Sequence, residues 1–486
     1  MTKNRKLFDD FITIQYSTTA QVTPRTIVVA EAFGLGIDEE KTFTVFDKQP
    51  ITVYQGDVVY ITGDSGGGKS SLLKALSDKI KNVIQLNDIK VKDDEVLIEG
   101  VGDSVEDALR ILTRSGLGDA FLMLRKYKEL SDGQKYRYLI AKMISSKKDV
   151  WLIDEFCATL DRPLALVIAF SIQKIARSLG KTLLVATTHH DMLRDLQANL
   201  VISKNFGGRV QVDRPEYKEH EFSLFNKISY RLGTYQDYQQ SGLSSFHYKN
   251  DKRPAGLINT YLAEYDGQII GALLTRYPAL EIRERNVVTN KKYVKNYKQL
   301  NAEVEMISRV VVHSKFRGVG LGTKLVKAYL DSQYAKLIVE SMSVMSQHNP
   351  FFERAGMERI ILKQEDKKVL PSYNKMIAAL TDLKFDVNLT ASTTYNLDRV
   401  KLLKKAELDI LVPLVMKEFW RVNHLYDVDN KERLDKVKEV VDKTNAGQYT
   451  LEFLAEAIKK TRKPVLSYVI WSKDKTIMQE IKSKNG

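Results

Sequence analysis

The chain has 486 residues, of which 43% are hydrophobic and 28% are charged, a balance typical of globular proteins. This length exceeds what one core supports, and about two to four domains are expected. We find no apolar run long enough to span a bilayer and no apolar core of a secretory signal, which argues against membrane transport by this chain alone. The single cysteine, Cys157, excludes an intramolecular disulfide and favours a reducing, cytoplasmic location.

The net charge of +14 is unevenly distributed along the chain. Residues 1–214 hold 30 Lys and Arg against 28 Asp and Glu, and the remainder holds 45 against 33, so the two parts carry +2 and +12. A lysine-rich surface that only aids solubility explains this asymmetry. Contact of the second part with a polyanion such as nucleic acid explains it as well. The asymmetry between the parts favours the polyanion.

The first 214 residues alternate strand-like and helix-like runs, which predicts an α/β sheet. An apolar strand at 57–62 leads into a glycine-rich loop, and a helix follows that loop. The runs 150–153 and 182–186 are typical of buried parallel strands, and each ends in polar residues. Ligands of such sheets bind at the carboxyl ends of the strands. A turn-rich stretch closes this first domain, 1–214.

A second α/β domain is expected at 215–370. Its first signal is a hairpin over 258–274, with Asp266-Gly267 at the turn. A strand at 304–312 then precedes a second glycine-rich loop and a helix at 323–333. The sequence therefore repeats the order of strand, glycine-rich loop and helix.

The remainder, 371–486, is expected to be mainly helical. Helical patterns occur for instance at 431–443 and 451–460. A late apolar run, 465–471, is a candidate strand that returns to the sheet of the second domain.

The first glycine-rich loop has the spacing G-x-x-x-x-G-K-S from Gly63 to Ser70. Glycines allow backbone N–H groups to point at phosphate oxygens. Lys69 is placed to reach the β and γ phosphates of a nucleotide, and Ser70 to offer its hydroxyl to Mg²⁺. The position of the loop between an apolar strand and a helix strengthens this interpretation.

Acidic and imidazole side chains follow two later strands. Asp154 and Glu155 end one strand, and His189 and His190 come after the next. A strand-terminal Asp can hold Mg²⁺, and the neighbouring Glu can orient or deprotonate the attacking water. A histidine one strand away can contact the γ-phosphate, with His189 as the candidate and His190 as the alternative. Two acids after a strand are also a common helix N-cap, but the order of the motifs favours ATP chemistry.

This series resembles the ABC-type ATPases over about residues 26–212. The resemblance implies ATP and Mg²⁺ as cofactors, Ser70 and Asp154 as metal ligands, and Glu155 and His189 as catalytic residues. It also implies a head-to-tail homodimer in which the signature residues of one subunit cap the ATP of the other. The implied ATP-binding residues belong to the Walker A loop, the signature and the D-loop: Gly63, Asp64, Ser65, Gly66, Gly67, Gly68, Lys69, Ser70, Ser71, Ser131, Gly133, Gln134 and Asp161.

The sequence departs from that pattern in two places. Asp132 stands at the second signature position, which is commonly Gly, and no Q-loop glutamine is found in the stretch after Asp94. For the adenine ring, Phe33, Phe43 and Phe46 are stacking candidates, although each is equally suited to core packing.

The second glycine-rich loop has the spacing R-x-x-G-x-G from Arg317 to Gly322, and backbone N–H groups at such a helix N-terminus suit a pyrophosphate. With the preceding strand and the later segment 349–357, it resembles the GNAT acetyltransferase superfamily over about 218–362. The resemblance implies acetyl-CoA or a related acyl-CoA as cofactor. The implied acetyl-CoA-binding residues are backbone groups of the strand and loop: Val311, His313, Arg317, Gly318, Val319, Gly320, Leu321, Gly322 and Thr323.

The candidate catalytic residues for acyl transfer match the common GNAT pattern less well than the acetyl-CoA loop does. Phe352 occupies the place where many GNAT enzymes have a tyrosine, and a phenyl ring has no proton to donate. Glu305 is the candidate general base, with a surface strand acid as the alternative. Further candidates are Glu340, Ser341, His348 and the pair His247-Tyr248, and a substrate ring could stack on Tyr248 or Tyr261.

The fold class expected for the whole chain is α/β: an ABC-type P-loop ATPase domain, a GNAT-fold domain and a helical C-terminal region. The arrangement resembles a family of ABC-ATPase–acetyltransferase fusions, and the second half distantly resembles the Mom-type DNA modification proteins. These resemblances imply an ATPase coupled to acyl transfer onto a DNA or RNA base. The alternatives are an ATP-regulated acetyltransferase for proteins or small amines, and an ATP-driven nucleic-acid clamp with a non-catalytic GNAT fold.

Overall fold

The structure is a computed structural model that describes residues 5–37, 40–205, 210–217, 221–246, 253–343, 349–361, 371–423, 450–462 and 467–485. The predicted mixed α/β class is confirmed, since the described residues form helices and three separate sheets. Two units are distinguished: Met1–Arg359 with Val469–Lys482, and Ile360–Tyr468 with Ser483–Gly486. The first unit holds both glycine-rich loops.

A six-stranded sheet in the order β4-β5-β6-β3-β7-β8 organises the N-terminal part. All its neighbours are parallel except β7 and β8. The strands are β3 (Val58–Thr62), β4 (Val83–Gln85), β5 (Val150–Ile153), β6 (Thr182–Ala186), β7 (Leu200–Lys204) and β8 (Val210–Asp213). The apolar strands β3, β5 and β6 are buried over their whole length, as expected for a parallel sheet covered on both faces.

Successive residues of these strands face opposite sides of the sheet. Tyr60 and Trp151 pack in the cluster that contains α6 (Arg162–Ser178). Ile61 and Leu152 pack on the other side with α2 (Lys69–Lys79). The helices that begin at functional motifs therefore cover the sheet from its two faces.

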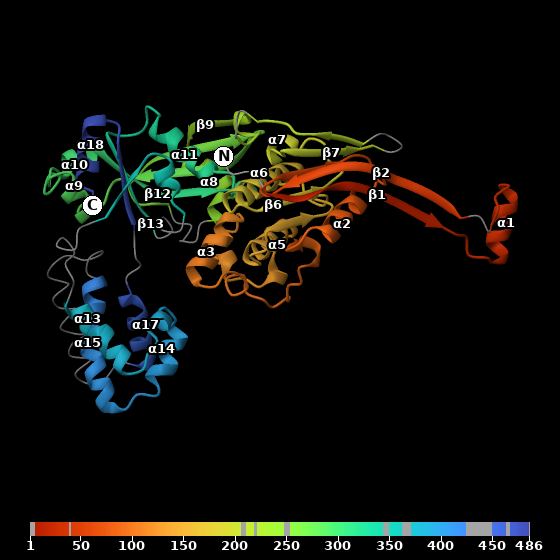
Figure 1. The fold of residues 1–486 in the computed structure, drawn as a ribbon. Coiled ribbons are helices and arrows are strands. Elements are labelled where there is room, and N and C mark those ends of the chain that lie inside the picture. The colour runs from red at the N-terminus through yellow and green to blue at the C-terminus, as the bar shows by residue number, and fades with distance from the viewer. Residues whose placement is uncertain are drawn as a thin grey trace. The chain divides into compact units, whose positions relative to one another are not determined.

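A long hairpin flanks this sheet. Its strands β1 (Lys6–Thr18) and β2 (Lys41–Tyr54) are antiparallel, and α1 (Pro24–Ala32) lies at its far end (Figure 1). A separate small core holds α3 (Val105–Arg114), α4 (Ala120–Met123) and α5 (Asp132–Ser145) together. One short helix, α7 (Leu193–Leu196), follows β6.

A seven-stranded sheet in the order β14-β15-β13-β12-β11-β10-β9 follows. Its strands are β9 (Ile228–Gly233), β10 (Leu257–Tyr265), β11 (Gln268–Arg276), β12 (Val304–Val312), β13 (Ile338–Ser343), β14 (Glu358–Ile360) and β15 (Ser467–Ser472). The expected hairpin is β10–β11, and Asp266 and Gly267 form its turn with positive φ. The expected late strand is β15, which lies between β13 and β14.

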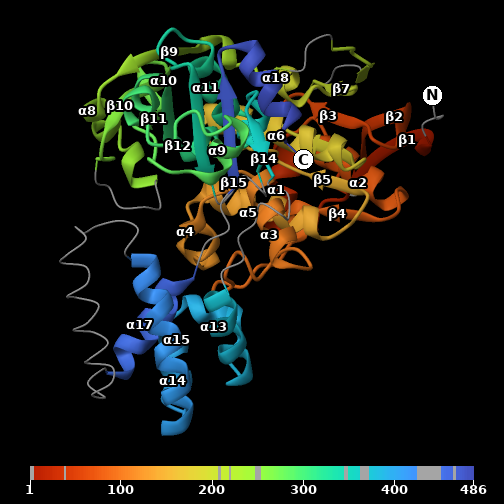
Figure 2. The same cartoon turned by 90° about the vertical axis from the view of Figure 1, so that its left-hand side faces the viewer.

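Helices accompany this sheet, and α11 (Leu321–Leu330) lies along it in Figure 2. The others are α8 (Tyr235–Gln240), α9 (Arg283–Val288), α10 (Tyr297–Glu303), α12 (Phe351–Arg354) and α18 (Lys475–Ser483). The side chains of Leu325 and Tyr329 on α11 are fully buried in the main core. This packing holds the N-terminus of α11 at the end of β12.

The second unit has a core of its own, built by α13 (Pro371–Asp382), α14 (Thr393–Val400), α15 (Lys405–Asn423) and α17 (Leu451–Thr461). The helix expected at 451–460 is α17, whereas the helix expected at 431–443 lies outside the described residues. Within the described ranges, no helix is both long and apolar enough to cross a membrane.

Candidate nucleotide and acyl-CoA sites

The first glycine-rich loop connects β3 to α2 and depends on glycine for its close approaches. A Cβ atom on Gly63 would lie 1.8 Å from the carbonyl oxygen of Lys204, and one on Gly68 would lie 2.2 Å from a methyl carbon of Val45. Both glycines have positive φ, 137° and 89°, a region that side chains disfavour. The loop therefore follows a path that other residues could not take.

Lys69 stands at the start of α2 and curls over this loop. Its ammonium donates to the carbonyl oxygens of Gly63 (2.9 Å) and Asp64 (2.6 Å). Burial lowers the pKa of Lys69, and the nearby carboxylates of Asp64 and Asp154 oppose that shift. The lysine is therefore placed between the loop and the acid at the end of β5.

The loop presents donors that the protein itself does not satisfy. Among the described residues, the N–H groups of Gly66, Gly68, Lys69 and Ser70 meet no protein acceptor. Such N–H groups at a helix N-terminus attract phosphate oxygens. The cradle thus fits the phosphates of a nucleotide, and Ser70 is exposed beside it.

The two strand-end acids follow one strand, β5, at the same edge of the sheet as the glycine-rich loop, and β6 lies between β5 and β3. Asp154 and Glu155 follow β5, and an Oδ of Asp154 accepts from the N–H of Glu155 at 2.9 Å. Glu155 is exposed and has φ +49°, a conformation more common at functional sites than elsewhere. Two strands from the glycine-rich loop, these carboxylates suit a Mg²⁺ ion that keeps waters and phosphate oxygens as further ligands.

The two histidines after β6 differ in their surroundings. The His190 ring nitrogen Nδ1 lies 3.1 Å from the Thr62 hydroxyl, directly before the glycine-rich loop. The carbonyl of His189 accepts from the Tyr60 hydroxyl, and its ring has a pKa lowered by burial and by Arg162. The geometry therefore brings the His190 ring to the loop, and this favours His190 over His189 as the phosphate-contacting residue.

The signature residues lie at the N-terminus of α5. Ser131 is the N-cap, and its N–H donates to the side-chain oxygen of Gln134 at 3.1 Å. A Cβ on Gly133 would lie 2.6 Å from the Leu164 side chain of α6. Asp132 stands in the first turn, where a negative charge interacts favourably with the helix dipole. This explains why an acid is tolerated at that position.

An aromatic residue beside the nucleotide loop was missed by the sequence reasoning. The Tyr16 hydroxyl donates to the Ser71 hydroxyl at 2.5 Å, and Tyr16 is paired with Phe43 across the β1–β2 hairpin. Both rings are about half exposed, whereas Phe46 is buried in the core and Phe33 caps the distant α1. Tyr16 and Phe43 are therefore the rings available to stack an adenine. Only the register of the hairpin reveals this pair.

The second glycine-rich loop connects β12 to α11 by way of a short 3₁₀ turn, Ser314–Phe316. Gly318 and Gly320 both have φ +97°, and Gly320 is the N-cap of α11. In the described part of the chain, the N–H groups of residues 318–323 meet no protein acceptor. Donors gathered at a helix N-terminus fit the pyrophosphate of an acyl-CoA.

The parallel strands β12 and β13 part next to this loop. Their register runs from Val304 opposite Ile338 to Ile307 opposite Ser341 and ends there, although β12 continues to Val312. The N–H of His313 donates to Ile270 at 2.9 Å on the β11 side. Backbone groups alternate along a strand, so the backbone of Val312 faces the gap between β12 and β13, and the backbones of the expected Val311 and His313 face β11.

Arg317, expected to hold the pyrophosphate, is tied to protein groups. Its Nε donates to the Val312 carbonyl at 3.0 Å, and its Nη1 lies 3.2 Å from a carboxylate oxygen of Asp119. The N–H groups of the loop, rather than the guanidinium, are thus the donors open to a ligand.

The candidate general base lies in the core. Glu305 is fully buried, and both of its oxygens accept from the Tyr329 hydroxyl at 2.9 Å. One oxygen also accepts from the N–H of Lys336 at 3.0 Å. Burial raises the pKa of Glu305, and these donors oppose that shift. Both interpretations made from the sequence, a base open to an amine and a surface acid, are disfavoured by this geometry, which supports a structural role.

The other transferase candidates are also engaged in packing. Glu340 is fully buried in an ion pair with Arg285 at 2.9 Å, and the Ser341 hydroxyl donates to the Ile307 carbonyl at 3.0 Å. Phe352 is buried, its ring stacked on that of Phe351. Tyr261 is likewise buried. His348, His247 and Tyr248 lie outside the described residues.

Residues 227–357 match the model of the acetyltransferase (GNAT) family. A maltose/maltodextrin import ATP-binding protein of Mannheimia succiniciproducens is 26% identical over 197 residues, 34% of this chain and 52% of that protein. An sn-glycerol-3-phosphate import ATP-binding protein of Escherichia coli is 29% identical over 217 residues, 36% of this chain and 59% of that protein. The chain thus spans little more than half the length of these two relatives.

A solved structure of a dimeric bacterial ABC transporter cassette is also similar, with 20% identity and a TM-score of 0.29, covering 36% of this chain and 94% of that one. By sequence, residues 227–357 form a domain of the GNAT acetyltransferase family. The region N-terminal to it is similar in sequence to import and ABC transporter ATP-binding proteins.

Proposed function

We propose that the chain couples ATP hydrolysis in its N-terminal part to acyl transfer from an acyl-CoA in its GNAT domain, with a nucleic-acid base as the acceptor. The main support for acyl transfer comes from the N–H groups of residues 318–323, which meet no acceptor among the described residues and lie next to the gap between β12 and β13. This arrangement offers a pyrophosphate a helix N-terminus and offers the pantetheine arm a strand edge.

For ATP, the residues of this chain have separate tasks. Lys69 and the loop N–H groups would hold the phosphates, and Ser70 and Asp154 would hold the Mg²⁺ ion, which supplies charge neutralisation when bound. Glu155 would orient the attacking water, and His190, with His189 as the alternative, would contact the γ-phosphate. Ser131 of a second copy would complete the site in a head-to-tail homodimer.

The acceptor class is argued from charge. The part of the chain from residue 215 carries a net +12 of the total +14, and a charge of this size attracts polyanions at low salt. The distant resemblance of the second half to the Mom-type DNA modification proteins adds to this argument only as a resemblance. The alternative acceptors are a protein lysine and a small amine.

A second candidate function is a nucleic-acid clamp with a non-catalytic GNAT fold. Two observations favour it: Glu305 is enclosed by Tyr329 and Lys336, and Phe352 has no proton to donate. The described residues thus contain no acid or base of the predicted set that lies open beside the gap between β12 and β13. In the transferase proposal, the acceptor amine would then have to lose its proton to water or to a residue outside the described ranges.

Radiolabelled acetyl-CoA distinguishes these functions. Purified full-length chain with ATP and Mg²⁺ is incubated with DNA, RNA or a protein mixture, and label in each acceptor is counted. Gly322→Glu places a carboxylate at the N-terminus of α11, where a Cβ meets only ordinary contacts at 3.8 Å. This charge repels pyrophosphate but not the helix dipole, so label should disappear while the fold is kept.

Gln268→Glu, at the exposed β10–β11 turn, adds the same charge away from the loop and should keep full activity. Label in nucleic acid that is lost with Gly322→Glu supports the proposal, and label only in protein moves the acceptor to lysine. Binding of nucleic acid without any label favours the clamp. Mass spectrometry of nucleosides from cells with and without the protein identifies the modified base.

A further inference from the structure

The acyl-CoA loop is held by a buried arginine of the signature helix. Arg137 lies on α5, six residues after Ser131, and is only 4% exposed. Its guanidinium donates to the carbonyl oxygens of Lys315 (2.7 Å) and Arg317 (3.3 Å), the first residues of the loop region. It also donates to the carbonyl of Gly116 at 3.0 Å. One side chain of the ATPase part thus fixes the backbone that leads into the acyl-CoA loop.

The close fit around this guanidinium depends on two glycines. A Cβ on Gly116 would lie 2.1 Å from Nη1 of Arg137. Gly318 approaches α6, where a Cβ would lie 3.0 Å from the Ser171 hydroxyl. Both glycines have positive φ, 81° and 97°. The acyl-CoA loop therefore lies close to α6 at Gly318, and the Arg137 side chain connects it to α5.

Two ion pairs connect the acyl-CoA loop region to the N-termini of α4 and α6. Arg317 pairs with Asp119, the N-cap of α4, and both side chains are largely buried. Lys315 pairs with Asp161 at 3.0 Å, and Asp161 is the N-cap of α6 at the D-loop position. Burial, and then the neighbouring Arg317, lower the pKa of Arg137 to about 10. A bound pyrophosphate would relieve this crowding of positive charge.

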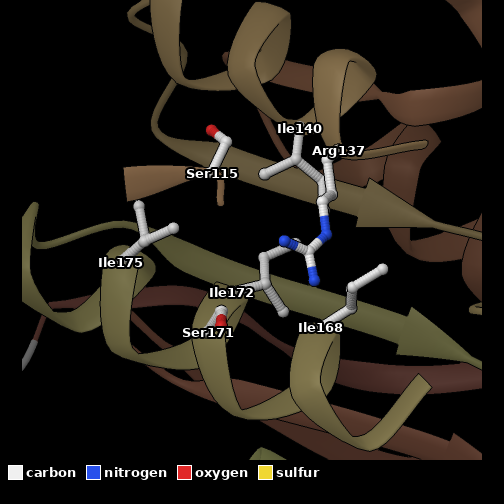
Figure 3. Close-up of a pocket in the computed structure, with 7 residues that line it drawn as sticks. All are labelled: Ser115, Arg137, Ile140, Ile168, Ser171, Ile172 and Ile175. Carbon is white, nitrogen blue, oxygen red and sulfur yellow. The ribbon is translucent and has the colours of Figure 1, made fainter. Parts of the chain in front are cut away.

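The space between α5 and α6 at this point is not completely filled. A small cavity lies beside Arg137, lined by Ser115, Ile140, Ile168, Ser171, Ile172 and Ile175. Figure 3 shows the Arg137 side chain reaching from α5 towards the helix that carries Ser171 and Ile172. The hydroxyl of Ser171 has no hydrogen-bond partner among the described residues. The contact between α5 and α6 therefore leaves a small void beside the Arg137 side chain.

We propose that Arg137 is a positioning residue that makes the affinity of the loop for acyl-CoA depend on the nucleotide bound by the ATPase part. The inference rests on the proposed function, because it requires both ligands. Helix α5 begins at the signature and α6 at the D-loop, the two segments that a nucleotide and a second copy would contact. A helix moves as a rigid element, so displacement of its N-terminus carries Arg137 and the carbonyls bound to it.

Coupling of this kind is reciprocal for binding. If a nucleotide changes the affinity for CoA through Arg137, CoA must change the affinity for that nucleotide by the same factor. The affinity of the loop for acyl-CoA would then rise and fall once in each cycle of ATP hydrolysis.

The test measures CoA binding by titration calorimetry with the full chain and Mg²⁺, in AMP-PNP and in ADP. In the wild-type chain the Kd for CoA should differ between the two nucleotides by about 5- to 150-fold, the usual range of allosteric coupling. In Arg137→Gln the difference should fall below about twofold, as this coupling is removed, while AMP-PNP still binds. Arg137→Lys keeps the positive charge but has one donor nitrogen instead of the guanidinium fork, and it should restore part of the difference.

Two further variants separate coupling from folding. Lys315→Gln removes the Asp161 pair, in which both side chains are more than 40% exposed, and should reduce the nucleotide effect without loss of fold. Lys135→Gln is the matched control, since Lys135 lies on α5 but over the ring of Tyr127, and it should keep the full effect. If Arg137→Gln does not fold, the test is whether the ratio of the CoA Kd values in the two nucleotides falls in Lys315→Gln and stays unchanged in Lys135→Gln.

The outcomes are distinct. A wild-type chain that binds no CoA refutes the proposed function itself. A wild-type chain that binds CoA with one Kd in both nucleotides overturns the coupling and leaves the proposed function intact. Coupling that survives unchanged in Arg137→Gln and Lys315→Gln overturns the role of this contact.

Discussion

Glu305→Gln separates a structural role of this buried acid from a catalytic one. In the structure one oxygen of Glu305 accepts from Tyr329 and Lys336, and the other accepts from Tyr329. A glutamine has the same shape, its oxygen can still accept from Lys336, and its amide can donate to the Tyr329 oxygen. The expected loss in the free energy of opening of the seven-stranded sheet is therefore at most about 1 kcal/mol.

Glu305→Ala has a much larger expected cost. It leaves the Tyr329 hydroxyl and the Lys336 N–H buried without an acceptor, at about 1–3 kcal/mol each, and adds a cavity. We expect a total loss of about 3–5 kcal/mol. Hydrogen exchange of β12 and α11 peptides in the full chain, read by mass spectrometry, measures both variants against the wild type.

The pH dependence of stability provides a second, independent test of the structural role of Glu305. Burial raises the pKa of Glu305 above its ordinary value, so the native state binds its proton more tightly than the unfolded state does. In the wild type, protonated Glu305 therefore contributes to the stability of the folded state. This contribution is fully present below the pKa of the unfolded state and is lost as the pH rises through the pKa of the folded state. Glutamine does not titrate, so the stability of Glu305→Gln relative to the wild type should improve from pH 5 to pH 8.

The structural role would be refuted by either of two results. One is a Glu305→Gln variant that loses several kcal/mol of opening free energy. The other is a variant with wild-type exchange whose acetyl transfer falls by about 10²- to 10⁴-fold, the loss expected when a general base is removed.

Three further predictions concern the nucleotide site. Gly63→Ala should abolish ATP binding in a filter assay, because its Cβ would lie 1.8 Å from the Lys204 carbonyl; unchanged binding would contradict the loop path. Tyr16→Ala should weaken ATP binding by about 5- to 150-fold, the loss of about 1–3 kcal/mol of base stacking, and GTP binding should weaken in parallel since any base can stack. His190→Ala should slow ATP hydrolysis by at least about tenfold, because a contact with the γ-phosphate is lost. His189→Ala should slow hydrolysis less. A larger effect of His189→Ala would instead assign the γ-phosphate contact to His189.

The local motifs of this protein could be predicted because their chemistry is local. A loop that must bring N–H groups to a phosphate needs glycines at set spacings, so Gly63 and Gly68 identify the first loop and Gly318 and Gly320 the second. Strands such as β3 and β6 are uniformly apolar since both faces of the sheet are covered. These features depend on residues that are adjacent in the chain, and the sequence alone determined them.

What the sequence could not determine were the partners of side chains distant along the chain. Tyr16 lies beside the nucleotide loop only because the β1–β2 register and a hydrogen bond to Ser71 place it there. Glu305 has the carboxylate that a catalytic base needs. Only the packing of α11 over β12 shows that this carboxylate is buried against the Tyr329 hydroxyl. Burial is a property of the whole core, so no local pattern reports it.

The same division holds for the two glycine-rich loops together. Each loop could be predicted from its own residues. The contact through Arg137 that connects them could not, because in the sequence Arg137 is an ordinary basic residue within a helical pattern. Only the tertiary structure brings its guanidinium to the Lys315 and Arg317 carbonyls, 178 and 180 positions further along the chain. The physical reason is that a buried guanidinium requires acceptors from whichever segment packs against it, and that segment is chosen by the fold.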